Sequence, residues 1–316
     1  MRNCRPNHHC NRAIVVLLIS VLLLSSCAVP PAAKRITAFS SATSMTANSV
    51  TAAFDTVEQS YYQTQIQTLI VNYDKNGFNP KSIKPFLTSD DLEVRAKILG
   101  GLQEYAQKLS DVVSDQHLTE FDTQTKAFGQ ALVDLKGNPV LKNIAAGVPD
   151  TGLNILTTAV DSLGRWFIDY KRQKNLPTII GDMQKPVDGI CTLFIADIGS
   201  RPDDSGRGGH GLRDQLWRQY DSLLQLQDEF IQKSKDKFDP KTKAEEIAKL
   251  PLLVAEQKKA DNTLKATQDA LQKLSETHKA LTKAFEKNNP SLEELISQLY
   301  AEGQRVKTFY EGLGKK

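Results

Sequence analysis

The feature that most constrains the fold of this chain is the spacing of its apolar residues, which repeats at intervals of three to four positions. Such spacing places apolar side chains on one face of an α-helix. The first clear stripe ends before Asn76-Gly77 and Pro80, which predict a helix end. Its apolar members are Val50, Phe54, Val57, Tyr61, Ile66, Leu69, Ile70 and Tyr73.

Similar stripes recur along the chain and are separated by clusters of Gly, Asn and Pro that predict further helix ends. No alternating run is long enough to require a strand, and no repeat of 20–50 residues is present. We therefore predict an all-α fold, an elongated bundle of long antiparallel helices. The further stripes lie at residues 92–113, 118–135, 212–231, 252–287 and 291–310.

The C-terminal part contains leucines at heptad-like positions. Thr267 and His278 interrupt this seam, so we expect a coiled-coil-like helix packed within its own chain and not an independent two-stranded coiled coil. The seam residues are Leu264, Leu271, Leu274, Leu281 and Phe285.

Residues 49–316 are predicted to form a single helical domain. Its apolar central part, about 139–198, has few charges, and we expect a helix there that is buried on most sides. Residues 199–211 contain Pro202 and several glycines, which predicts a flexible loop. Long helices are expected over 212–313.

The beginning of the chain has a different pattern. Arginines at positions 2, 5 and 12 precede an almost purely apolar run, Ile14–Leu24. Eleven residues span only about 16 Å as a helix, roughly half of a bilayer's hydrocarbon core. This pattern is typical of the core of a secretory signal peptide, which predicts that residues 1–26 are removed.

Leu24-Ser25-Ser26-Cys27 follows this run, an aliphatic residue and two small residues before a cysteine. It resembles the lipobox of bacterial lipoproteins, although the resemblance covers only the first 27 residues. It implies cleavage before Cys27 and attachment of acyl chains such as palmitate to that cysteine, which anchor the chain to a membrane. An uncleaved apolar anchor with an incidental cysteine is the alternative.

The residue after the cysteine bears on location. Inner-membrane lipoproteins often have an aspartate there, whereas this chain has Ala28. The resemblance therefore implies the outer membrane, with the body in the periplasm. Residues 27–48 are rich in Ala, Ser, Thr and Pro, and we expect a flexible tether that holds the body about 25 Å from the bilayer. An ordered arm on the body is the alternative.

Charge and composition exclude some classes of function. Three of the 40 basic residues and none of the 37 acidic residues precede Cys27, so the remaining chain carries equal numbers of each. Nothing in this balance indicates a nucleic-acid partner. Cys191 is the only cysteine after Cys27, so the fold does not depend on an intramolecular disulfide.

No catalytic or metal-binding pattern stands out. His117 and His278 have no second His or Cys at metal-ligand spacing and are interpreted as structural. Cys191 has apolar neighbours, which predicts a buried, unreactive thiol. The segment Gly206–Gly211 lacks the strand and the Gly-Lys-Ser/Thr ending of a phosphate loop, although Arg207 and backbone N–H groups could hold an anion. We expect no cofactor and no metal.

These observations favour a non-enzymatic, outer-membrane-anchored helical protein that acts as an interaction or scaffold protein in the periplasm. Its expected partners are the membrane, through the lipid, and a protein. One alternative is a membrane-active protein resembling helical pore-forming toxins in layout. Another is an enzyme or small-ligand binder with a site near residues 140–211, where the loop would form a lid.

Overall fold

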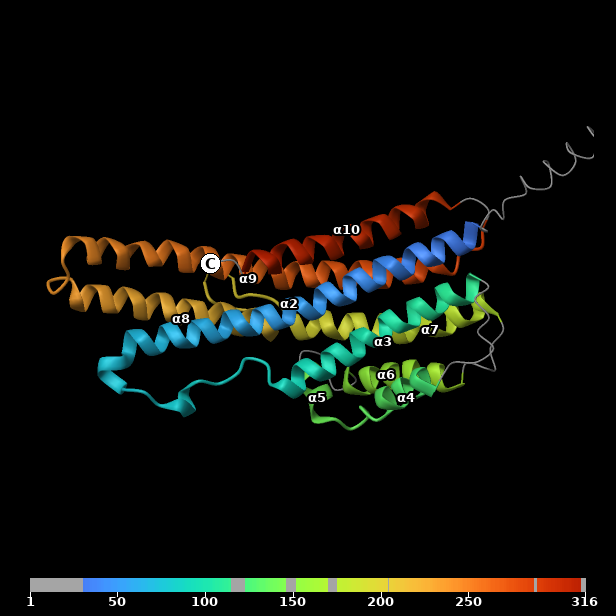
Figure 1. The fold of residues 1–316 in the computed structure, drawn as a ribbon, viewed down its shortest axis with the longest axis horizontal. Helices are drawn as coiled ribbons and strands as arrows, with labels where there is room; N and C mark the ends of the chain where they lie inside the picture. Colours follow the sequence, from blue (N-terminus) through green and yellow to red (C-terminus); the bar gives the residue numbers. More distant parts are fainter. Residues whose placement is uncertain are drawn as a thin grey trace, which may run out of the picture.

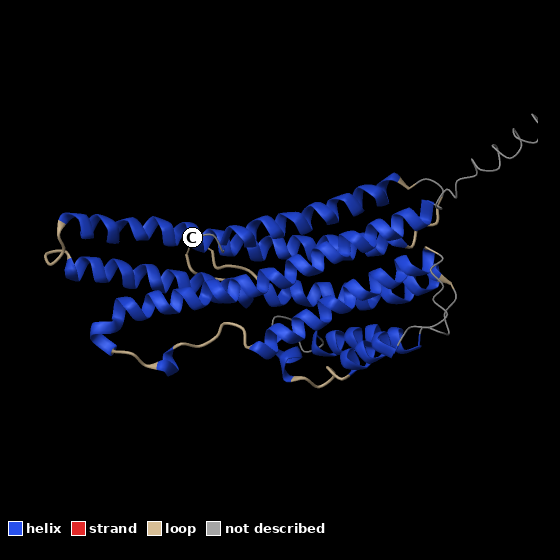
Figure 2. Cartoon of the chain, viewed as in Figure 1, coloured by secondary structure: helices blue, strands red, loops and turns tan. Residues whose placement is uncertain are grey.

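The computed structural model describes residues 31–114, 123–145, 152–169, 175–203, 205–286 and 289–313. Within these residues the chain forms nine α-helices and one short 3₁₀ helix, and no strand is present (Figure 2). The prediction of an all-α bundle is confirmed. The coiled-coil-like character of the C-terminal part remains a prediction.

The helices are long near both ends of the described chain and shorter in its middle. Their bounds are α2 Pro31–Asn76, α3 Ser89–Val113, α4 Thr123–Val133, α5 Pro139–Ala145, α6 Gly152–Asp169, α7 Leu176–Ile198, α8 Gly211–Ser234, α9 Pro240–Leu281 and α10 Pro290–Leu313, and the 3₁₀ helix is η1 Pro80–Ser82.

The long helices lie side by side along the long axis of the molecule (Figure 1). α2 packs along α3 and α10, and α10 also packs along α9. α7 lies between α9 and α6, and α4 covers α6 from the outside. Since α9 contacts α2, α7, α8 and α10, its leucine seam is buried within its own chain, as we expected.

The two ends of the long axis are built differently (Figure 1). At one end, which we call the base, Arg35 of α2 donates hydrogen bonds to the carbonyl oxygens of Ala284 and Glu286, at 3.1 and 2.6 Å. It also pairs with Glu293 of α10 at 3.2 Å. These contacts join the beginnings of α2 and α10 to the residues that follow α9.

At the opposite end, α8 and α9 form a hairpin with the last turns of α2 beside it (Figure 1). We call residues 62–78 and 224–256 the distal arm. α9 has 42 residues and runs from the tip of this arm to the base. At about 1.5 Å per residue, the tip lies about 63 Å from the base.

The prediction of a flexible tether over residues 27–48 is wrong for residues 31–48, which form about the first five turns of α2. The alternative, an ordered arm on the body, describes them. Their buried side chains are mostly small and polar or alanine, so the stripe is poor in large apolar residues. These small side chains let α2 and α10 pack closely. A Cβ at Gly303 of α10 would lie 3.1 Å from Thr46 Oγ1.

The apolar central part divides into α5, α6 and α7. The expectation of one helix buried on most sides is wrong for α6, because Asn154, Ile155, Thr158 and Arg165 are exposed along one of its faces. No helix in the described residues has the length and hydropathy needed to cross a membrane.

Candidate functional site

The predicted lipidation site lies outside the described residues. Cys27 and the preceding Leu24, Ser25 and Ser26 all fall before Pro31, where the described chain begins. Cys27 is four positions from Pro31, and four residues of extended chain reach at most about 14 Å. Because Pro31 begins α2 at the base, the predicted site is within about that distance of the base.

A polar cluster in the interior of the bundle joins α3, α7 and α9. His278 of α9 lies 2.9 Å from the hydroxyl of Tyr105 through Nε2 and 2.9 Å from Gln184 Oε1 through Nδ1. Burial lowers the pKa of His278 to about 3, so the ring is neutral at pH 7. Burial also raises the pKa of Tyr105 well above its ordinary value. The partners support the interpretation of His278 as structural, and His117 lies outside the described residues.

A second buried cluster joins α3 to α7. Arg95 and Asp197 form a two-pronged ion pair with nitrogen–oxygen distances of 2.8–3.1 Å. Burial raises the pKa of Asp197 to about 6, although the charge of Arg95 opposes this rise. Asp91 adds a contact to Arg95 at 3.7 Å. The guanidinium of Arg95 and the carboxylate of Asp197 therefore have partners inside the protein, which offset the loss of hydration on burial.

Cys191 is fully buried on α7, as predicted. Burial raises the pKa of its thiol, and the nearby charge of Asp188 raises it further. Since the thiolate is the reactive form, this position gives an unreactive cysteine.

The loop at 199–211 folds back on itself. Ser200 and His210 form an isolated antiparallel bridge, with backbone hydrogen bonds of 2.9 and 3.0 Å. Asp203 Oδ1 accepts from the backbone N–H groups of Ser205 and Arg207, both at 2.9 Å. A carboxylate of the loop itself therefore occupies the position that an anion would take. The hypothesis of an anion held by these N–H groups is thus not favoured.

The same loop is tied to the neighbouring helices. Gln268 of α9 donates to the carbonyl oxygens of Ile195 and Gly199, both at 2.8 Å. Asp261 of α9 pairs with Arg213 at 2.7 Å. The guanidinium of Arg201 lies over the ring of Trp217, 4.8 Å from its centroid. These contacts fix the path of the chain from α7 into α8 and are not those of a free lid.

A hollow of about 740 Å³ lies between α6 and α7; we call it the α6–α7 groove. It falls inside the range 140–211 in which the sequence placed an alternative site. None of its described lining residues comes from the 199–211 loop. The lining residues are Asn154, Ile155, Thr158, Ala159, Ser162, Arg165, Trp166, Asp169, Asp182, Met183, Lys185 and Pro186.

Close contacts at two glycines fix the position of α6 beside this groove. On one side α6 is drawn against α4, where a Cβ at Gly164 would lie 2.6 Å from the carbonyl oxygen of Gly129. On the other side α6 meets α7 at Gly189, whose Cβ would lie 3.2 Å from Ile155. Between these contacts, the short side chains of Thr158, Ala159 and Ser162 leave the groove open. The signal in the sequence was this run of small residues, which sequence reasoning did not single out.

The distal arm exposes apolar side chains. No residue of α9 from 240 to 256 is buried. Within the arm, Gln227 of α8 donates a hydrogen bond to Glu246 of α9 at 2.9 Å. Just outside the arm, Gln257 of α9 donates to Asp221 of α8 at 2.7 Å. Large apolar side chains of the arm that are 46–64% exposed are Ile70, Tyr73, Phe78, Ile247 and Leu252.

The described residues contain no cluster of three or more His, Cys, Asp or Glu side chains able to hold a metal ion. Comparisons with protein-family models, with curated proteins and with solved structures find no match to this chain.

Proposed function

We propose that this chain is an outer-membrane lipoprotein, anchored by acyl chains on Cys27, whose helical body acts in the periplasm as a non-enzymatic interaction or scaffold protein. The distal arm is the surface that meets a protein partner. The observation that carries this proposal is the exposed apolar set on the arm, whose α9 members Leu252 and Ile247 lie about 44 and 51 Å from the end of α9 at the base.

The position of α2 supports the anchor. If Cys27 carries the acyl chains, only three residues separate the lipid from Pro31, where α2 begins. The base then lies close to the bilayer, because four residues of chain reach at most about 14 Å. A body built mainly of long parallel and antiparallel helices is suited to hold its other end at a distance from the membrane.

The composition of the arm supports a protein partner. Ile70, Tyr73 and Phe78 come from α2 and the residues after it, whereas Ile247 and Leu252 come from α9. Large exposed aromatic and aliphatic side chains are enriched at protein contact surfaces, and these five lie on or next to the helices of one end of the molecule (Figure 1). The arm also carries many lysines and acids, which would form the polar rim of such a contact.

Metabolic labelling with an alkyne analogue of palmitate tests the anchor. The full chain is expected to incorporate the label and to sediment with membranes, and Cys27→Ser is expected to lose both properties. Cys191→Ser is the matched control, since this buried thiol should leave labelling unchanged. Labelling that persists in Cys27→Ser would contradict the proposal.

A photo-crosslinking amino acid at position 252 tests the contact surface, because Leu252 is 64% exposed. We expect a discrete crosslinked protein in living cells. Ile247→Glu and Ile70→Glu together should abolish the product, because a buried charge in an apolar contact is unfavourable. Ile155→Glu is the control, because Ile155 of α6 is exposed to nearly the same extent as Ile247, 47% and 46%, and it should leave the product intact. Absence of any discrete product at position 252 would count against the arm as the contact surface.

A further inference from the structure

We infer that the base of the bundle is a bilayer-contact surface, where Phe285 enters the headgroup layer and Lys34 and Lys283 contact lipid phosphates. The inference deepens the proposed function and rests on it, because acyl chains on Cys27 bring the base to the membrane. It identifies the side chains of the folded body that meet the lipid, which the anchor alone leaves open.

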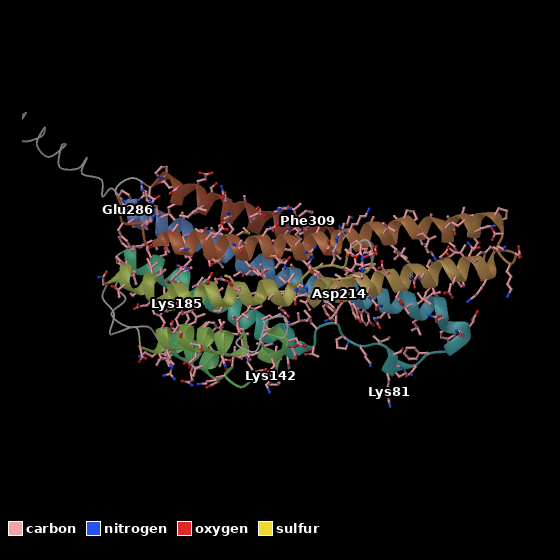
Figure 3. The ribbon with its side chains drawn as sticks, turned by 180° about the vertical axis from the view of Figure 1, so that it is seen from behind. Lys81, Lys142, Lys185, Asp214, Glu286 and Phe309 are labelled. Carbon is pink, nitrogen blue, oxygen red and sulfur yellow. The ribbon has the colours of Figure 1, made fainter. Side chains whose placement is uncertain are left out.

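Three stretches of the chain come together at the base. Arg35 connects them, because it donates to the carbonyl oxygens of Ala284 and Glu286 and pairs with Glu293. Figure 3 shows Glu286 at the end of the molecule where α2 begins, away from Lys81 of the opposite half. We call the three stretches the base surface, and they are residues 31–38 of α2, 279–286 at and after the end of α9, and 290–296 of α10.

Phe285 is the only aromatic residue of the base surface. It lies between the two residues whose carbonyl oxygens accept from Arg35, so its backbone is held in place, although 41% of the residue is exposed. The exposed Pro31 and Pro290 begin the two neighbouring helices. An exposed phenylalanine next to a membrane is stabilised at the boundary between headgroups and acyl chains. The base surface therefore offers the bilayer an apolar side chain that the bundle leaves uncovered.

The charges of the base surface are compatible with lipid phosphates. It contains four basic and three acidic side chains. Glu293 is paired with Arg35 at 3.2 Å. The exposed Lys34, Lys279 and Lys283 have no ion-pair partner among the described residues. Because a lysine stem is long and flexible, its ammonium group can reach the phosphates while the phenylalanine lies deeper.

The short link to Cys27 makes contact with the bilayer favourable. Cys27 precedes Pro31 by four positions, a reach of at most about 14 Å, and Arg35 is about one helical turn further along. A surface tethered so closely meets the membrane in an intramolecular event, so a small contact area is sufficient. The exposed Leu252 of the distal arm lies about 44 Å from the end of α9, and only a body lying flat would bring it to the bilayer.

Quenching of tryptophan by brominated lipids measures the contact directly. The chain from Cys27 onward is suitable, because the described core lies between residues 31 and 313. Its Cys27 is coupled to a maleimide phospholipid in vesicles of phosphatidylethanolamine and phosphatidylglycerol, and the fully buried Cys191 does not compete. The vesicle lipids carry bromine on their acyl chains near the headgroup. The tryptophan of Phe285→Trp should be quenched by these vesicles and not by vesicles without bromine.

Phe78→Trp on the distal arm is the matched control, because Phe78 is also exposed, to 59%. Bromine should change neither its emission nor that of the parent chain, which contains Trp166 and Trp217. Quenching of Phe285→Trp that does not exceed that of Phe78→Trp would overturn the inference. Since the tether is supplied chemically, this result does not depend on whether Cys27 is lipidated in cells, which the palmitate labelling tests separately.

A second pair of variants tests the lysines. Lys34→Glu with Lys283→Glu should lower the quenching of Phe285→Trp by about twofold or more, because carboxylates are repelled by the anionic bilayer surface. Lys75→Glu with Lys81→Glu changes two exposed lysines far from the base and should leave the quenching unaltered. If both double variants quench as strongly as Phe285→Trp alone, the assignment of Lys34 and Lys283 to lipid phosphates is wrong.

Discussion

At the scale of single residues, the interior of this bundle is held in register by polar side chains that find partners across helices. The hydroxyl of Tyr105 and the ring of His278 join α3 to α9, and Gln184 adds α7. Arg95 and Asp197 join α3 to α7 at a second point. Apolar contacts tolerate sliding of one helix along another, whereas directional contacts of buried polar groups do not.

The Arg95–Asp197 pair gives the first prediction. Asp197→Ala should lower the free energy of unfolding by about 3–5 kcal/mol, because it leaves the guanidinium buried without its main counter-charge. Urea denaturation measures this loss. Glu229→Ala removes the exposed partner of Lys233 and should cost less than about 1 kcal/mol. Equal losses of unfolding free energy in the two variants would show that burial does not make the Arg95–Asp197 pair more important for stability than an exposed pair.

His278 gives a prediction about pH. Its pKa is about 3 in the folded protein against 6.5 for an ordinary histidine, so the unfolded chain binds the extra proton between these values. Its contribution to stability is complete above pH 6.5 and is lost as the pH falls toward 3. At pH 5 the loss of unfolding free energy amounts to about 2 kcal/mol.

Asp197 changes stability in the opposite sense, because its pKa is raised to about 6 and the folded protein gains a proton first. The measurement is therefore a comparison of urea denaturation at pH 7.5 and pH 5 between the parent chain and His278→Gln. The parent should lose about 2 kcal/mol more than the variant over this interval. The same pH dependence in both proteins would contradict the prediction.

At the scale of elements, the sequence predicted helices well where their stripes consisted of large apolar residues. It failed at the beginning of α2, where the buried positions are Ala33, Ile36, Phe39, Ala42 and Ala47 among serines and threonines. Composition of this kind is also typical of a linker, and only the partner helix decides between the two. The partner, α10, lies more than 240 residues away in sequence.

The packing of α4 against α6 gives a prediction at this scale. Gly164→Ala should lower the free energy of unfolding by about 1–3 kcal/mol, because its Cβ would lie 2.6 Å from the backbone oxygen of Gly129. Gly181→Ala on α7 is the matched control. Nothing lies within 4 Å of its Cβ, so alanine should raise stability by about 0.5–1 kcal/mol through its helix propensity. Thermal unfolding distinguishes the opposite signs.

At the scale of the whole molecule, periodicity and helix-ending residues were sufficient for the fold class, because each helix is specified locally. The α6–α7 groove was not predictable in the same way. It lies beside α6, whose packing against α4 at Gly164 and against Gly189 of α7 is a tertiary property. The distal arm was also missed, since the apolar stripe of α9 gives no indication of which residues remain uncovered.

This uneven burial predicts uneven stability along a single helix. In α9, residues 240–256 have no buried member, whereas residues 260–281 include the buried Leu264, Leu271 and His278. Local opening costs less free energy where few apolar contacts are broken. Hydrogen exchange of the unlipidated chain, measured without a partner, should therefore be at least tenfold faster over 240–256 than over 260–281. Equal protection along α9 would mean that the arm belongs to the same cooperative unit as the core. Faster exchange in the arm alone would mean that the arm can change its conformation at little free-energy cost to the rest of the bundle.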